Sequence, residues 1–105
     1  MAKPRHPAEE PMQLRHPDPR KKMPRMARDS YAIAHKTALA VLPKRAPGIT
    51  LDEFLAEMAT RLPKLKGWDR SASASWWAMA IKLDMEARGE VKRVNDKPPQ
   101  RLVRS

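Results

Sequence analysis

The chain has 105 residues, no cysteine, and a formal net charge of +10 from 22 Lys and Arg against 12 Asp and Glu. That length suits one domain of ordinary size, and the missing cysteine excludes disulfides, thiol nucleophiles and Cys-ligated zinc. No apolar run approaches the roughly 18 residues of a membrane span, and no apolar signal-type segment follows the basic N-terminus. We therefore expect a soluble, cytoplasmic protein whose partner is a polyanion, above all nucleic acid.

The N-terminal stretch, residues 1–28, holds six of the 11 prolines and carries eight basic against three acidic residues, a net charge of +5. Proline removes a backbone donor and disfavours helix at the preceding residue. The stretch is therefore predicted to be a disordered basic arm, able to neutralise phosphates or acting only as a solubilising tail. Residues 29–105 supply the other +5 and are predicted to form one small domain.

The first periodic segment predicts a helix from Ser30 to Leu42. The Ser30 hydroxyl can cap the first turn, and Pro43 stops the helix because proline cannot continue it. The apolar residues at helical spacing are Tyr31, Ala34, Ala38, Val41 and Leu42. His35 is expected to be exposed on this helix.

The second predicted helix has the clearest start signal, because Thr50 and Glu53 form a capping box in which each side chain satisfies the other's backbone N–H. Its apolar stripe, about three turns long, consists of Leu51, Phe54, Leu55, Met58 and Leu62. Pro63 ends it. Just ahead of the helix, Ile49–Leu51 is a candidate for a short strand.

Ser71–Arg88 is the longest predicted helix. At 100° per residue, its core face would consist of Trp76, Ala80, Leu83 and Ala87, widened by Trp77 and Ile81. Its solvent face would consist of Ser71, Ala74, Ser75, Ala78 and Lys82. Asp84 and Arg88 form a favourable i,i+4 pair, and Gly89 stands where a helix-ending glycine belongs.

After Gly89 the apolar period drops towards two. Two basic segments, Glu90–Val94 and Gln100–Arg104, flank a Pro-rich turn at residues 95–99. This pattern predicts a two-stranded hairpin. Because an isolated hairpin is barely stable in water, it must lean on the helices.

The order of helix, short strand, two helices and hairpin resembles the winged helix-turn-helix domain over residues 29–105. Trp76–Val91 and Pro99–Leu102 also resemble a small bacterial family that shares an aromatic pair, a V-K-L-D-L-E-A-R-G-type segment and a terminal P-Q-R-L. These resemblances imply an α+β fold of three helices with the C-terminal hairpin as the wing and Ser71–Arg88 as the recognition helix. Fold alone does not assign a function.

The function expected from this reading is binding of double-stranded DNA, as a small regulator or accessory DNA-binding protein. In helix-turn-helix docking the start of the recognition helix meets base edges, and a basic wing can follow backbone or enter the minor groove. The predicted contact residues are Arg70, Ser71, Ser73, Ser75, Lys82, Lys92, Arg93, Lys97, Arg101 and Arg104. Specificity should be low to moderate, because the helix lacks the Arg, Asn or Gln that read bases bidentately.

Two other binding classes remain open. A protein–protein interaction module could dock on the apolar remainder of the third helix, with Met79 and Met85. RNA binding is permitted by the arm, but the hairpin lacks the aromatic residues that stack single-stranded bases. Trp76 and Trp77 could stack bases, although a domain with few aromatic residues favours them as core.

Catalysis, a cofactor and a metal site are not expected. The sequence has no Gly-rich phosphate loop, and His35 has no nucleophile at a meaningful spacing. Asp84 and Glu86 point to different faces of one helix. His6 and His16 lie in the Pro-rich arm and do not form a metal-binding pattern.

Overall fold

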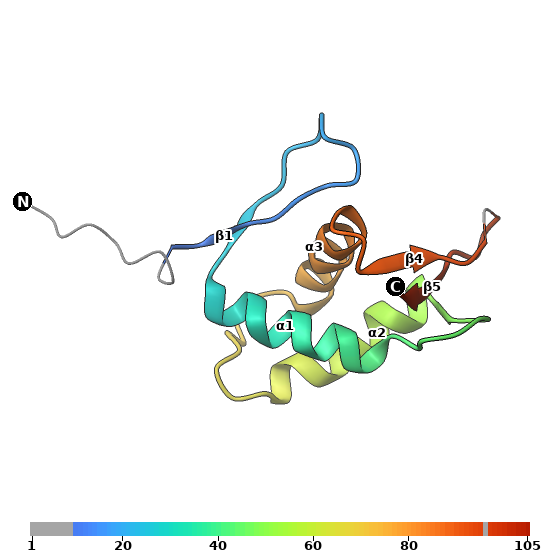
Figure 1. The fold of residues 1–105 in the computed structure, drawn as a ribbon. Coiled ribbons are helices and arrows are strands. Elements are labelled where there is room, and N and C mark those ends of the chain that lie inside the picture. The colour runs from blue at the N-terminus through green and yellow to red at the C-terminus, as the bar shows by residue number, and fades with distance from the viewer. Residues whose placement is uncertain (1–9, 96) are drawn as a thin grey trace, which may run out of the picture.

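The computed structural model describes residues 10–95 and 97–105. These residues form an α+β fold of three α-helices and two small antiparallel sheets (Figure 1). The helices are α1 (Arg28–Val41), α2 (Leu51–Arg61), the 3₁₀-helix η2 (Leu62–Lys64) and α3 (Ala74–Ala87). The strands are β1 (Met12–Gln13), β2 (Arg25–Met26), β3 (Ile49–Thr50), β4 (Val91–Arg93) and β5 (Arg101–Arg104).

The capping box and apolar stripe predicted for α2 are confirmed. The Glu53 backbone N–H donates to the Thr50 hydroxyl over 3.1 Å, and the Thr50 N–H donates to the Glu53 carboxylate over 3.3 Å. The hydrogen bonds from Thr50 lower the pKa of the Glu53 carboxyl. The stripe residues with no exposed surface are Phe54, Met58 and Leu62. They centre the core on α2, with α1 and α3 packed against it.

The start of α1 differs from the prediction. The helix begins at Arg28, after Ala27, so Ser30 lies inside the first turn and is not its cap. Asp29 in that turn is favoured by the positive end of the helix dipole. The buried side chains of α1 are small, so neighbouring elements can approach this helix closely; they are Ala34, Thr37 and Ala38.

The predicted core face of α3 is confirmed at Ala80 and Ile81, but the buried face is rotated about the helix axis relative to the prediction. The helix begins at Ala74, with Ser73 as its cap. Trp76, expected in the core, is 55% exposed, whereas Lys82, expected in solvent, is 2% exposed. The buried residues are Ala78, Ala80, Ile81, Lys82, Asp84 and Met85. Because apolar residues surround most of α3, their period alone does not select the face that neighbouring elements cover.

The C-terminal strands form where the alternating pattern predicted them. The sheet has the order β3-β5-β4, with Ile49 opposite Leu102 and Val91 opposite Arg104. Gly89 ends α3 at a φ of 77°, a left-handed conformation that costs glycine little. Residues 91–104, with β4 and β5, are called the C-terminal hairpin below.

The expectation of a disordered arm is wrong for residues 10–28, and residues 1–9 lie outside the described part of the chain. β1 pairs with β2, and Leu14 and Met26 are 2% and 3% exposed in the core. Burying such side chains gains about 25 cal/mol per Å², which opposes the entropy cost of ordering the segment. The composition of the segment does not reveal this stabilisation, because only two apolar side chains, Leu14 and Met26, provide it among many charged residues and prolines. We call residues 10–28 the N-terminal hairpin.

Candidate nucleic-acid interface

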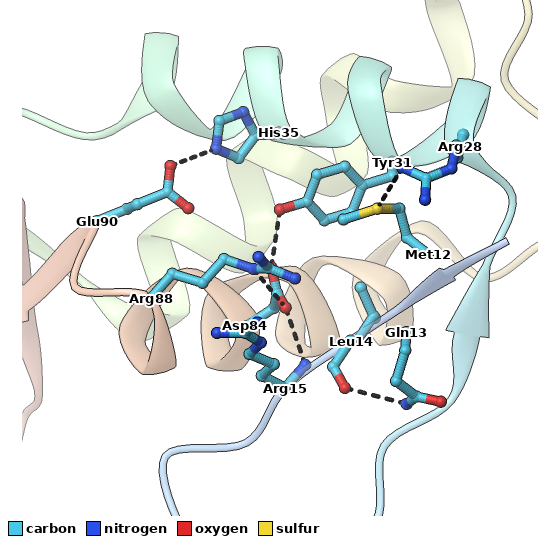
Figure 2. Close-up of polar contacts among 10 residues, drawn as sticks. All are labelled: Met12, Gln13, Leu14, Arg15, Arg28, Tyr31, His35, Asp84, Arg88 and Glu90. Carbon is cyan, nitrogen blue, oxygen red and sulfur yellow. Dashed lines mark hydrogen bonds and ion pairs between the residues drawn. The ribbon is translucent and has the colours of Figure 1, made fainter. Parts of the chain in front are cut away.

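A buried carboxylate on α3 anchors the N-terminal hairpin (Figure 2). Asp84 has no exposed surface and accepts hydrogen bonds from the Arg15 backbone N–H and the Tyr31 hydroxyl, both over 2.8 Å. It also accepts from Nε of Arg88 over 2.9 Å. Its three partners therefore come from the hairpin, from α1 and from the end of α3. A buried charge is tolerated when it is paired and hydrogen-bonded in this way.

The same network extends along α1. Burial, together with the hydrogen bond to Asp84, raises the pKa of the Tyr31 phenol. The Tyr31 ring stacks on the His35 ring, with centroids 5.5 Å apart, and His35 Nε2 lies 2.7 Å from a carboxylate oxygen of Glu90. His35 was expected to be exposed, but it is half-buried and links α1 to the segment entering β4.

The N-terminal hairpin presents most of its positive charge to solvent. Its exposed cations are Arg15, Arg20, Lys21, Lys22, Arg25 and Arg28. Asp18 pairs with Arg20 over 3.1 Å, and that hydrogen bond lowers the pKa of the Asp18 carboxyl. A hollow of about 500 Å³ lies between this hairpin and Ala87 at the end of α3. Lys21, Lys22 and His16 line it, so its walls suit an anion.

The C-terminal hairpin carries a second set of cations. Lys92, Arg93 and Lys97 are exposed, whereas Arg101 and Arg104 are half-buried. Arg93 donates from Nε to Glu86 over 3.0 Å. No carboxylate among residues 10–95 and 97–105 lies within ion-pair distance of Lys92 or Lys97. Of the residues predicted on this hairpin, Lys92 and Lys97 are therefore the exposed cations that pair with no carboxylate of the described residues.

The predicted contact residues at the start of α3 are Arg70, Ser71, Ser73 and Ser75, and all are exposed. All three serines are engaged locally, since the Ser73 and Ser75 hydroxyls also lie 3.5 Å apart. The Ser71 hydroxyl donates to Asp69 over 2.6 Å, and the Ser73 hydroxyl accepts from the Trp76 N–H over 3.3 Å. The hydrogen bonds from Ser71 lower the pKa of the Asp69 carboxyl, so a negative charge stands beside Arg70.

Lys82 is buried and does not lie on the solvent face where the groove contact was predicted. It is 2% exposed, and its Nζ lies 3.4 Å from Oε1 of Glu86. Burial lowers the pKa of Lys82. Lys82 is the only Lys or Arg between Ala74 and Ala87, so α3 presents no cation of its own. Met85, predicted on a docking face, is also buried.

Arg15, Lys21 and Lys22 form part of an ordered surface that was not predicted from the sequence. A signal was present, because Met12 and Leu14 alternate with polar neighbours and a Pro-Asp-Pro turn follows at residues 17–19. That pattern is typical of one arm of a hairpin. The role of Asp84 as its anchor has no local signal, since the Arg15 partner lies 69 residues away.

Among residues 10–95 and 97–105, His, Asp and Glu side chains nowhere gather in threes as a metal site would require. In the same part of the chain, every helix is too short or too polar to cross a bilayer.

Taken together, the described elements define a small basic α+β protein with cations on two hairpins. Residues 11–102 match a family of unknown function (DUF6958), and the chain belongs to that family. The match includes nearly all of the N-terminal hairpin together with the helices and most of the C-terminal hairpin. No curated protein and no solved structure matches the chain.

Proposed function

We propose that this protein binds double-stranded DNA and that its fold is a winged helix-turn-helix. The order α1-β3-α2-α3-β4-β5 and the strand order β3-β5-β4 support the fold. In this reading α2 and α3 occupy the helix-turn-helix positions, and the C-terminal hairpin is the wing. The start of α3, near Arg70, is the part that would enter the major groove.

The observation that carries the proposal is that both basic hairpins reach the last turn of α3. The N-terminal hairpin reaches it at Ala87, where Lys21 and Lys22 line the hollow between this hairpin and α3. The C-terminal hairpin reaches it at Glu86, which pairs with Arg93. Two groups of exposed cations thus flank the C-terminal end of α3, and the start of α3 near Arg70 is its other end. Such an arrangement releases counterions from two stretches of a phosphate backbone.

The proposed binding has low to moderate sequence specificity. The less buried residues of α3 include Ser75, Trp76 and Met79, none of which reads guanine or adenine bidentately. Affinity would come mainly from phosphate contacts, which position a protein without selecting a sequence. A role as a regulator or accessory DNA-binding protein in the cytoplasm fits this balance.

The test is fluorescence anisotropy of a labelled random-sequence duplex of about 20 base pairs, titrated at several salt concentrations. We expect Lys92→Ala/Lys97→Ala to weaken binding and to reduce the salt slope by about 2. The matched control is Lys44→Ala/Arg45→Ala, which removes two exposed cations between α1 and β3. An unchanged slope in the hairpin variant, or equal losses in both variants, would contradict the proposal.

Docking of a protein partner on α3 is the second candidate function. The specific observation in its favour is the 55% exposure of Trp76, since tryptophan is enriched at interface hot spots. Absence of duplex binding at low salt would favour this candidate. An NMR titration with duplex separates the two, because DNA binding must shift the amides of both hairpins.

A further inference from the structure

A groove that shares no residues with the two basic hairpins lies between α1 and the end of α2. Ile33, Thr37 and Ala40 line it from α1 at helical spacing, and Leu65 lines it just after η2. Its volume is about 500 Å³, within the range of about 300–1,000 Å³ usual for ligand pockets. None of its lining residues belongs to either hairpin, so variants can alter it without changing the hairpin cations.

The floor of this groove is apolar although it contains a threonine. The Thr37 hydroxyl donates to the Ile33 backbone carbonyl over 2.7 Å, so its donor is already used. Thr37 therefore lines this floor with no free hydroxyl hydrogen, together with Ile33 and Ala40. Leu65 is 39% exposed at the other wall. A floor of this kind favours apolar side chains, because removing their surface from water supplies the binding free energy.

The rim of the groove is entirely cationic. Four exposed basic residues line it, namely Lys36, Arg61, Lys64 and Lys66. Arg61 pairs with Glu57 over 2.8 Å. Within the described part of the chain, no carboxylate lies within ion-pair distance of Lys36, Lys64 or Lys66. Three uncompensated positive charges therefore surround an apolar floor.

From this charge pattern we propose that the groove docks an acidic amphipathic helix of a partner protein. Apolar side chains spaced at i, i+3, i+4 and i+7 would enter the groove between α1 and η2, as in other helix-in-groove complexes. Acidic side chains beside them would meet Lys36 and Lys64 on opposite walls. Nucleic acid would use the cations but gain nothing from the floor, which distinguishes this groove from the hairpin surface.

The probe is a fluorescein-labelled peptide of about 16 residues, with leucines at that helical spacing and Glu or Asp elsewhere. Anisotropy of this peptide is measured against the full chain. A scrambled peptide of the same composition, with its leucines dispersed around the helix, is the matched ligand control. We expect the amphipathic peptide to bind at least about tenfold more tightly, because only it can place its leucines on the groove floor together.

Two variants test the floor and the rim separately. Ala40→Trp fills the groove at an exposed position without changing charge, and Lys36→Glu/Lys64→Glu reverses two rim charges. Each should weaken peptide binding by about tenfold or more. Lys44→Glu/Arg45→Glu changes net charge equally outside the groove and should weaken binding by less than about threefold. Thermal unfolding of each variant confirms that its fold is retained.

The outcomes are distinct. Equal binding of the two peptides, or equal losses in both charge-reversal variants, would reduce the effect to the overall positive charge and overturn the proposal. Binding that survives Ala40→Trp would also overturn it. Random duplex is titrated against the same variants, and its affinity should be unaffected by Ala40→Trp. Failure of duplex binding with retained peptide binding would reject only the proposed DNA function.

Discussion

The two basic hairpins differ in what holds them to the helices. The C-terminal hairpin is joined by backbone pairing, since β5 bonds to β4 on one side and to β3 on the other. The N-terminal hairpin has only two paired positions and is fixed by side chains. These are Leu14 and Met26 in the core and the distant carboxylate of Asp84. The ladder between β4 and β5 is local and can be anticipated from a short segment, whereas the β3–β5 pairing and the side-chain anchor depend on the whole fold.

The largest expected effect comes from removing that anchor. Asp84→Ala leaves the Tyr31 hydroxyl, the Arg15 N–H and Arg88 without their shared acceptor. Truncating one partner of a buried charge pair costs about 3–5 kcal/mol, so we expect a loss of that size in the free energy of unfolding. Urea denaturation measures it. Hydrogen exchange should show that the Arg15 amide loses protection before the amides of β5.

Asp52→Ala is the control for that experiment, because Asp52 is exposed in the first turn of α2. Its removal should cost less than about 1 kcal/mol. If Asp84→Ala were no more destabilising than Asp52→Ala, Asp84 would not be the anchor of the N-terminal hairpin.

The next largest effect on the free energy of unfolding tests whether the N-terminal hairpin contributes to the core. Leu14→Ala should lower the free energy of unfolding by about 3 kcal/mol, because Leu14 is 2% exposed. Leu65→Ala, at a leucine 39% exposed, should change it by less than about 0.5 kcal/mol. Chemical denaturation followed by tryptophan fluorescence compares the two. A Leu14→Ala variant as stable as Leu65→Ala would restore the disordered-arm reading.

Much of the domain could be predicted from its sequence, because its signals are local. The capping box at Thr50, the glycine at residue 89 and the alternating pattern before Arg104 act over a few residues each. The orientation of α3 could not, since apolar residues surround it and the neighbours that cover Lys82 are chosen by tertiary packing. Among the predicted contact residues, the exposure of the cations on the C-terminal hairpin could be predicted from the local alternating pattern alone. Near Arg15 a local hairpin pattern exists, but the contact that holds this hairpin on the fold comes from Asp84, which is 69 residues away.

A smaller effect compares the hairpins as DNA-binding surfaces. Lys21→Ala/Lys22→Ala removes two exposed cations from the N-terminal hairpin. If it is an equal partner of the C-terminal hairpin, the salt slope of duplex binding should fall by about 2. That is the loss expected for Lys92→Ala/Lys97→Ala. Anisotropy with random duplex measures both. A slope altered by only one of the two pairs would assign phosphate contact to one hairpin alone.

The smallest expected effect concerns Lys82, which pairs with Glu86, the carboxylate that also pairs with Arg93 of the C-terminal hairpin. Lys82→Met should stabilise the protein by about 1 kcal/mol at pH 7, because replacing a buried charge by an apolar side chain of similar size removes its desolvation cost. Glu86 keeps Arg93 as its partner. Duplex affinity should not change, since Lys82 is 2% exposed. A marked loss of affinity would return Lys82 to the DNA-binding surface.

The pH dependence of stability gives an independent test of whether burial destabilises the charged form of Lys82. Burial holds the pKa of Lys82 in the folded chain below its unfolded value of 10.5. Between the lowered pKa and 10.5 the unfolded chain binds the extra proton, so wild-type stability rises with pH across that window. Lys82→Met lacks this rise, and its advantage over wild type should shrink as the pH approaches 10.5. Urea denaturation of both proteins at neutral and alkaline pH measures the difference. An advantage that grows with pH would show that Lys82 is stabilised in its charged form, contrary to its burial.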